Sequence, residues 1–251
     1  MKIQIASDLH TEHSQHTPKL MVTDADLIVL AGDIGSGVFG IQWAADLAQA
    51  HGKPVLYVAG NHEFYFQEYA PALEAMRTEA LRWGVQFLEQ DTVVIKGVRF
   101  LGTTLWTDYA CNVQMPQDLA CWVAGRSLAD HEVISFEGRT FRPQDALRLH
   151  RASVAWLETQ LSIAAPPTVV ITHHGPSLLC EHPHFGMNDI APCFYSERTD
   201  LVHQADLWVF GHTHANLDIT LDPGRLVSNQ LGYPGEHIPG GFDPGLVVTV
   251  P

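Results

Sequence analysis

The sequence predicts an α/β fold in which two mixed β-sheets are sandwiched between helices, a four-layer α/β/β/α arrangement. Short apolar runs alternate with amphipathic segments of helical length, which is typical of layered α/β domains. A second group of runs is separated by turn-forming residues, as in antiparallel hairpins. Apolar residues make up 46% of the chain and charged residues 17%, so the composition suits a globular protein with a large core.

Five apolar runs predict strands that are buried on both faces. Each run is short and lacks the polar alternation of a half-exposed strand. They cover residues 2–7, 27–31, 55–59, 168–172 and 207–210.

Three segments between these runs have the periodicity of helices with one apolar face. They are 38–51, 69–83 and about 143–163. The third places Ala146, Leu149, Val154, Leu157 and Leu161 toward the core. Helices of this length between strands support the layered α/β class.

A second group of strands is predicted at 92–105, as two strands around Lys96-Gly97, and at 217–221, 225–228 and 246–250. Turn formers such as Asp222-Pro223-Gly224 separate them. We expect this group to form a second sheet that packs on the first, with the helices outside.

The segment 106–142 fits neither pattern, because it is polar, irregular and rich in aromatic residues. Long loops in compact domains are usually functional or disordered. This one has enough aromatic side chains to pack, so we expect a small irregular cap inserted into a single domain that spans residues 1–251. The aromatic residues are Trp106, Tyr109, Trp122, Phe136 and Phe141.

The charge balance and the cysteine pattern exclude several classes. The formal charge is -14, which repels the phosphate backbone of a long nucleic-acid duplex. The four cysteines show no CxxC spacing and no disulfide framework. No segment approaches the length of a signal-peptide core or a membrane span. We therefore expect a cytoplasmic protein that does not enter a membrane.

Potential metal ligands follow all five apolar runs directly. In open α/β sheets, ligands bind beyond the carboxyl ends of the strands, so side chains that are distant in sequence can converge there. The residues at these ends are Asp8, His10, Asp33, Asn61, His62, Glu63, His173, His174, His212 and His214.

These residue types suit a pair of metal ions. A carboxylate can bridge two ions, and neutral imidazoles complete the coordination without adding charge. Two ions about 3.5–4 Å apart can polarise a phosphoryl group and orient an attacking nucleophile. The DxH and HxH spacings put alternate side chains on one side of an extended chain. Gly32, Gly60 and Gly211 precede the ligands and allow close backbone approach.

The motifs SDLH, AGD, AGNHE, THH and GHTH occur in this order between about residues 2 and 235. In order and approximate spacing they resemble the calcineurin-like metallophosphoesterases. The fold of that family, two sheets sandwiched by helices, agrees with the fold predicted above.

The resemblance implies a role for each matching residue. Asp8, His10 and His214 would bind one metal, and Asn61, His173 and His212 the other, with Asp33 bridging the two. His62 matches the general acid that protonates the leaving oxygen. The implied reaction is hydrolysis of a small phosphate ester by metal-bound hydroxide, with Mn, Fe or Zn as the two ions. Phosphomonoesters, nucleotides, cyclic nucleotides and other diesters all fit this core, so both a phosphatase and a phosphodiesterase are consistent with it.

Two features depart from parts of the family pattern. The loop 228–234 resembles an Asn-Pro-containing loop of some small members, but Gln230 stands where proline is common. The turn after Asp33 is a plain AGDIGSG and lacks the Asp-Arg continuation of the protein Ser/Thr phosphatases, which disfavours that subgroup.

Simpler interpretations compete for individual residues. Asp8 and Asp33 alone could be helix caps or turn formers, and His62 could merely orient a ligand. We expect structural roles for Glu63 and His174. A separate zinc site at Cys180, His182, His184 and Cys193 is disfavoured, and we expect a loop over the active site there, in which His182 or His184 could touch substrate. Arg126, Arg139 and Arg142 of the cap could bind a second phosphate or be solvated.

Two other functions stay open. One is a metal-binding scaffold of the same fold that has lost catalysis, which the complete ligand set and His62 disfavour. The other is a dinuclear hydrolase of amides or lactones, which the absence of an HxHxDH cluster disfavours.

Overall fold

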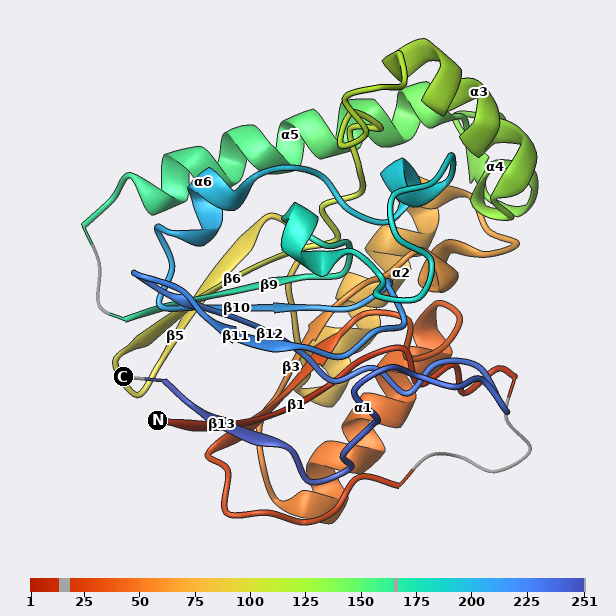
Figure 1. Ribbon diagram of the computed structural model, residues 1–251. Coiled ribbons are helices and arrows are strands. Elements are labelled where there is room, and N and C mark those ends of the chain that lie inside the picture. Colours follow the sequence, from red (N-terminus) through yellow and green to blue (C-terminus); the bar gives the residue numbers. More distant parts are fainter. Residues whose placement is uncertain (14–18, 165–166, 251) are drawn as a thin grey trace.

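Two β-sheets face each other in the structure, a computed structural model, and helices cover both outer faces (Figure 1). The structure describes residues 1–13, 19–164 and 167–250. The predicted four-layer α/β/β/α class is confirmed.

The first sheet has the strand order β13-β1-β2-β3-β4. The four strands β1 to β4 run parallel, and β13 pairs antiparallel with β1 at the edge. Their bounds are β1 Lys2–Ala6, β2 Leu27–Ala31, β3 Val55–Val58, β4 Gln86–Phe87 and β13 Val247–Thr249.

The second sheet has the order β11-β12-β10-β9-β6-β5. Its four central strands are parallel, and both edge strands are antiparallel to their neighbours. The bounds are β5 Asp91–Ile95, β6 Val98–Thr103, β9 Thr168–Thr172, β10 Leu207–Phe210, β11 Asp218–Thr220 and β12 Arg225–Ser228.

Three strands, β9, β10 and β13, lie in a different sheet from the one predicted for them. β9 and β10 belong to the second sheet with the hairpin strands, whereas β13, expected in the second sheet, lies in the first. The reason is that both sheets are covered on both faces, so a buried strand has the same apolar pattern in either. Alternate side chains of β1 and β2, such as Ile3 and Val29, pack between the sheets against Val169 and Val209.

Helices α1 (Val38–His51) and α2 (Tyr69–Trp83) cover the first sheet. Helices α5 (Pro143–Leu161) and α6 (Thr199–Val202) cover the second (Figure 1). The first two match the predicted bounds. The third predicted helix ends at Leu161, two residues before the predicted end. Three short 3₁₀ helices are η1 (His62–Phe64), η2 (Leu178–Cys180) and η3 (Ala191–Cys193).

The segment 106–142, called the cap segment below, is more regular than predicted. It contains helices α3 (Gln117–Ser127) and α4 (Asp130–Val133) and a hairpin of β7 (Ser135–Phe136) and β8 (Arg139–Thr140). Figure 1 shows it at one end of the sandwich, beside α5. Of its five aromatic residues, four are buried, while Trp122 is exposed. They belong mainly to the core, as the composition of the segment indicated.

All four cysteines are free and buried: Cys111, Cys121, Cys180 and Cys193. Burial raises the pKa of each thiol above its usual value. In the described part of the chain, every helix is too short or too polar to cross a bilayer.

Candidate metal centre

The carboxyl ends of the central strands of both sheets meet at one end of the sandwich. Asp8, Asp33 and Asn61 follow β1, β2 and β3 of the first sheet. His173 follows β9, and His212 follows β10, in the second. These side chains are buried. The parallel central strands of the two sheets thus bring residues that are far apart in the sequence into one site.

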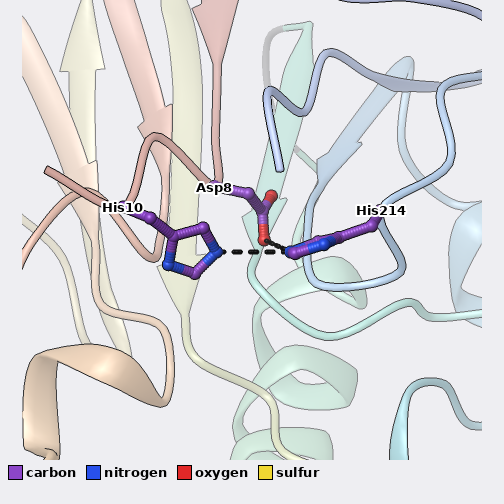
Figure 2. A group of neighbouring side chains, drawn as sticks. All are labelled: Asp8, His10 and His214. Carbon is purple, nitrogen blue, oxygen red and sulfur yellow. Dashed lines mark hydrogen bonds and ion pairs between the residues drawn. The ribbon is translucent and has the colours of Figure 1, made fainter. Parts of the chain in front are cut away.

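Figure 2 shows the first group of neighbouring donors, Asp8, His10 and His214, with their side chains pointing toward one another. His10 Nε2 lies 3.3 Å from His214 Nε2. Asp8 Oδ1 lies 3.5 Å from the same His214 nitrogen. The donor atoms of the three residues all lie within 4.8 Å of one another, which is the spacing that ligands of one ion require.

A second group consists of Asp33, His173 and His212, again within 4.8 Å. Asp33 Oδ2 lies 3.3 Å from His173 Nε2, and Asn61 Oδ1 lies 3.1 Å from that nitrogen. Asp33 Oδ2 is also 3.9 Å from His10 Nε2 of the first group. Asp33 therefore stands between the two groups.

The donor set fits divalent metal ions. Two of its atoms, Asp8 Oδ2 and His212 Nε2, are buried and have no hydrogen-bond partner among the described residues. Buried polar atoms in proteins are nearly always paired. A carboxylate oxygen and an imidazole nitrogen can each coordinate a cation, which would pair both atoms. Mixed imidazole, carboxylate and amide oxygen donors suit Mn, Fe, Zn or Ni.

The charges of the site also suit a cation. Burial opposes the ionisation of Asp33, but the neighbouring His173 outweighs it, and the pKa of Asp33 lies well below its usual value. Burial likewise opposes protonation of His173, but Asp33 raises its pKa to about 9. Burial lowers the pKa of His212 well below its usual value. Asp33 and His212 are thus in the forms that bind metals, a carboxylate and a neutral imidazole, whereas His173 would release a proton when an ion binds.

Backbone N–H groups hold one oxygen of each carboxylate. His62 N donates to Asp33 Oδ1 at 2.9 Å, and His212 N donates to Asp8 Oδ1 at 3.0 Å. Asp33 Oδ2 remains directed at His173 and His10. Asp8 Oδ1, in contrast, both accepts the bond from His212 and lies near His214, and Asp8 Oδ2 is unpaired among the described residues. The His212 bond also joins the turn after β10 to the end of β1, and thus one sheet to the other.

Five of the candidate ligands have a positive φ, a conformation that costs roughly 1–2 kcal/mol for a residue with a side chain. Such strain is concentrated at functional sites. The five are Asp8 (53°), His10 (45°), Asp33 (53°), His212 (70°) and His214 (50°).

Glycines allow the close approach that the sequence predicted. A Cβ at Gly60 would lie 2.1 Å from Asp33 Oδ1, and one at Gly211 would lie 2.6 Å from Asp8 Oδ2. Both carboxylates would have to move, so a side chain at either position would displace a candidate ligand.

Glu63 is a structural residue of the site, as expected. Its carboxylate accepts hydrogen bonds from the backbone N–H groups of Asp33, Ile34 and Gly60 at 3.0, 2.8 and 2.7 Å. It also accepts one from Tyr57 Oη at 2.6 Å. It thereby fixes the turn after β2 against the turn after β3.

His62 lies outside the two groups that contain Asp8 and His173, but it forms a third group with His10 and Asp33, whose donor atoms also lie within 4.8 Å of one another. Its Nε2 is 3.9 Å from Asp33 Oδ2 and 3.0 Å from Tyr233 Oη. Its ring stacks on Tyr65, with centroids 4.1 Å apart. Burial lowers its pKa, but Asp33 and then Glu12 outweigh that effect, so the pKa is raised.

Glu12 is a site residue that the sequence analysis missed. Its Oε1 accepts from His62 Nδ1 at 2.9 Å and lies 3.3 Å from His10 Nδ1. One carboxylate oxygen thus orients two imidazoles. Its position two residues after His10 repeats the Asp8–His10 spacing, and this signal could have identified it.

Asp130 of α4 is a second missed residue. Asn61 Nδ2 donates to Asp130 Oδ1 at 2.8 Å, and Tyr65 Oη donates to the same atom at 2.7 Å. The amide nitrogen of Asn61 is thus held by the cap segment, and its oxygen points to His173. No sequence signal connects a cap residue to Asn61.

The loop 228–234 supports the HxH turn. Gln230 Oε1 accepts from His214 N at 2.6 Å, and its Nε2 donates to Ala215 O at 2.9 Å. Gly232 N donates to Asp8 O at 3.0 Å. Glu236 Oε2 accepts from His214 Nδ1 at 2.7 Å, which fixes the ring with Nε2 toward Asp8. Gln230 therefore has a structural role at the position where proline is common in the similar loop.

His174 is buried, and its ring lies edge-on to that of the candidate ligand His173, with centroids 5.3 Å apart. Its ring packs 5.2 Å from Trp106 and 4.1 Å from His212, measured between centroids. Burial lowers its pKa well below the usual value. These contacts agree with the structural role that the sequence predicted.

A pocket of about 380 Å³ opens onto the candidate ligands. Leu128 and Ala129 of the cap segment and the 182–195 loop supply its outer wall. Its lining residues are Asp33, Asn61, His62, Tyr65, Leu128, Ala129, His182, Phe185, Gly186, Asn188, Ile190, Ala191, Phe194, Tyr195, His212, Thr213, His214, Tyr233 and Glu236. The loop predicted to lie over the site is therefore part of the pocket, and His182 lines it.

Other candidate residues are not brought together. Within the described ranges, no metal-binding group contains Cys180, His182, His184 or Cys193. The arginines of the cap segment lie outside the pocket lining. Arg139 forms a bidentate ion pair with Asp145, and Arg126 stacks on Trp122.

Comparison with known proteins shows the family to which the chain belongs. The family model of the calcineurin-like phosphoesterases matches residues 1–216, and the chain belongs to this family. Its sequence is 22% identical over 218 residues to the uncharacterized protein L509 of Acanthamoeba polyphaga mimivirus, covering 78% of this chain and 73% of that protein. The crystal structure of a phosphopantetheinyl hydrolase from Mycobacterium tuberculosis superposes with a TM-score of 0.75 at 20% identity, covering 93% of this chain and 90% of that one.

Proposed function

We propose that the protein is a metal-dependent phosphoesterase with two metal ions, acting on a small phosphate ester. The observation that carries the proposal is the position of Asp33, whose Oδ2 lies near His10 of one donor group and His173 of the other. Each group contains residues that follow strands of both sheets. Membership of a hydrolase family supports it. Mn, Fe and Zn are the candidate ions.

In this proposal, Asp8, His10 and His214 hold one ion, Asn61, His173 and His212 hold the other, and Asp33 bridges them. When bound, two such ions supply Lewis acidity and an activated water for attack on phosphorus. His173 and His214 are oriented by their other ring nitrogen, through the bonds from His173 Nδ1 to Ala31 O at 2.9 Å and from His214 Nδ1 to Glu236 Oε2 at 2.7 Å.

His62 is proposed as the general acid that donates a proton to the leaving oxygen. Its Nδ1 is held by Glu12, while Nε2 faces the pocket beside Tyr233. A general acid must lie within reach of the leaving group. The stack on Tyr65 keeps the ring in that orientation.

The test is a panel of esters with Mn²⁺, Fe²⁺ or Zn²⁺ added singly. It contains aryl phosphate monoesters and diesters, nucleotides, cyclic nucleotides and, because of the similar mycobacterial structure, a phosphopantetheinyl ester. Preference within the panel separates a phosphatase from a phosphodiesterase. Lack of turnover with every ion would contradict the proposal, and lactone or amide hydrolysis in its place would indicate a different hydrolase.

Two substitutions test the assigned roles. We expect Asp33→Ala to lose both metal ions, because both depend on the bridging carboxylate. His62→Ala is expected to keep both ions and to lose about 10²–10⁴-fold in kcat, the usual contribution of a general acid. Metal content is measured by plasma mass spectrometry after gel filtration.

Two metals at full occupancy in Asp33→Ala would rule out the bridging role. Unchanged metal content and an equally absent turnover in the wild type and in His62→Ala would instead indicate a scaffold without catalysis.

A further inference from the structure

None of the described residues that line the pocket above the candidate metal centre is Lys or Arg, and Glu236 of its wall is acidic. Of the pocket's histidines, His62, His212 and His214 lie at the candidate metal centre itself. His182 adds no cation, because burial and then His184 lower its pKa. A substrate group beyond the reacting phosphoryl therefore finds no positive partner in this wall.

Basic residues near the wall in sequence are engaged elsewhere, and Arg126, two residues before Leu128, stacks on Trp122. Arg139 pairs with Asp145 at 2.6 and 2.9 Å, and Arg198 pairs with Glu158 at 2.7 Å. Lys19 lines an adjacent pocket that shares Tyr233 and Glu236 with this one. Lys19 is therefore the cation against which the inference is tested.

The wall is built of apolar and aromatic side chains instead. Leu128 and Ala129 come from the cap segment, and the other apolar residues come from the segment around η3. These are Phe185, Ile190, Ala191 and Phe194. Phe194 lies over the candidate ligand His212, with ring centroids 5.0 Å apart. The apolar wall thus begins directly at the metal centre.

Size and exposure also indicate a small substrate. The volume of 380 Å³ lies at the small end of the range of about 300–1,000 Å³ found for small-molecule sites. Phe185 is 64% exposed and Ile190 is 37% exposed. An organic group in the pocket would cover these apolar side chains, and that burial would favour binding.

We propose that this pocket selects phosphate esters whose organic group is small, uncharged and aromatic or aliphatic, with Phe194 and the cap residues Leu128 and Ala129 determining specificity. The inference rests on the proposed function and deepens it. An ester with a second anionic group is rejected, because its charge would be desolvated in an apolar wall beside Glu236 without a counter-ion.

The experiment compares phenyl phosphate with 4-carboxyphenyl phosphate on the Zn²⁺-loaded protein. Their leaving phenols are similar in acidity, so a difference reports on binding. We expect kcat/KM to be about tenfold higher for phenyl phosphate, since an unpaired buried anion costs at least 1–2 kcal/mol. The difference should appear mainly in KM.

Ala129→Arg is a charge-gain variant, because Ala129 is exposed at the pocket wall. It should reduce the preference for the uncharged ester by up to about fivefold, since a rim ion pair contributes up to about 1 kcal/mol. Ala155→Arg is the matched control: Ala155 is exposed on α5 and does not line the pocket, so this variant should keep the wild-type preference.

A binding measurement accompanies the kinetics. Saturation-transfer NMR on the Zn²⁺-loaded protein should detect phenol but not 4-hydroxybenzoate. Phe194→Ala should weaken the phenol signal.

Equal or greater turnover of the carboxylated ester contradicts the inference alone, and loss of that turnover in Lys19→Ala would identify Lys19 as the overlooked partner. Absence of turnover on every ester contradicts the proposed function. In that case, binding of 4-hydroxybenzoate equal to that of phenol also contradicts the apolar selectivity of the pocket, and binding of phenol alone supports it.

Discussion

At the scale of single residues, the carboxylate of Glu12 orients two imidazoles at once, those of His62 and His10. Its Oε1 accepts from His62 Nδ1 and lies near His10 Nδ1. Carboxylates in this position fix the tautomer and orientation of a histidine, and their loss typically costs about 10–100-fold in activity or metal affinity. Glu12 is a positioning residue and acts through His62.

Glu12→Gln is therefore expected to lower kcat about tenfold for an alkyl phosphate, and much less for 4-nitrophenyl phosphate. An alkoxide needs a proton as it leaves, whereas nitrophenolate does not. KM should change little for either ester. The control is Glu74→Gln, at an exposed position of α2. Equal losses on the two esters would mean that Glu12 acts only on the structure or on metal binding.

The residues that the sequence predicted are those that directly follow the central strands. Asp8 and Asp33 stand beside buried runs, so their place at a strand end could be read from the pattern. Asp130 and Glu236 could not be identified in this way, because they reach the site from the cap segment and from a distant loop. Their contribution depends on tertiary packing that the local pattern does not contain.

At the scale of elements, the start of α5 shows how the long helix is anchored. Asp145 accepts a hydrogen bond from the N-cap Arg142 N at 2.9 Å. It also pairs with both terminal nitrogens of Arg139, at 2.6 and 2.9 Å. The carboxylate thus joins the hairpin β7–β8 to the first turn of the helix, where a negative charge is also favourable.

Asp145→Ala is expected to lower the free energy of unfolding by about 1–3 kcal/mol at pH 7, the range for hydrogen bonds to a charged group. Burial opposes ionisation of Asp145, but the bonds from Arg139 outweigh it and lower its pKa. Because the pKa of Asp145 is lower in the folded protein, its carboxylate stabilises the fold at pH values above the unfolded pKa near 3.8. This stabilisation is lost as the pH falls below that value and through the folded pKa.

Urea denaturation of both proteins at pH 7 and at pH 3 measures this effect, with Glu74→Ala as the exposed control. The difference between Asp145→Ala and the wild type should shrink at pH 3. A difference that is independent of pH would show that the ion pair and the helix cap contribute nothing through the charge.

The elements themselves were predictable to different degrees. Strong periodicity placed α1, α2 and α5 nearly correctly. Helix α3 was missed because its buried positions are the small residues Ala120, Cys121 and Ala124, which give a weak apolar face. The sheet membership of β9 and β13 was not predictable, since pairing is decided by non-local partners.

At the scale of the whole molecule, the site spans the boundary between the two sheets. His173 Nδ1 donates to Ala31 O at 2.9 Å, and His212 N donates to Asp8 Oδ1 at 3.0 Å. Donors from both sheets surround Asp33. An ion bound to this set would join the two sheets, and such binding stabilises only the folded state.

Mn²⁺ at about 100 times its Kd should therefore raise Tm by roughly 5–10 °C relative to protein with a chelator, from about 2.7 kcal/mol of linkage. Differential scanning calorimetry measures the change. The Asp33→Ala protein should show little increase. A shift of the same size in that variant would mean that the ion binds elsewhere.

The buried thiols give the cap segment a chemical reporter of its own motion. Cys121 of α3 and Cys193 of η3 lie in one core cluster, and Cys180 lies in another, beneath the second sheet's helices. Thiols of this kind react with alkylating reagents only after the chain opens locally. Cys111 lies in the same cluster as Cys180. Timed alkylation followed by mass spectrometry would therefore label Cys121 and Cys193 before Cys111 and Cys180 if the contact between α3 and η3 opens locally, and all four together if exposure requires global unfolding.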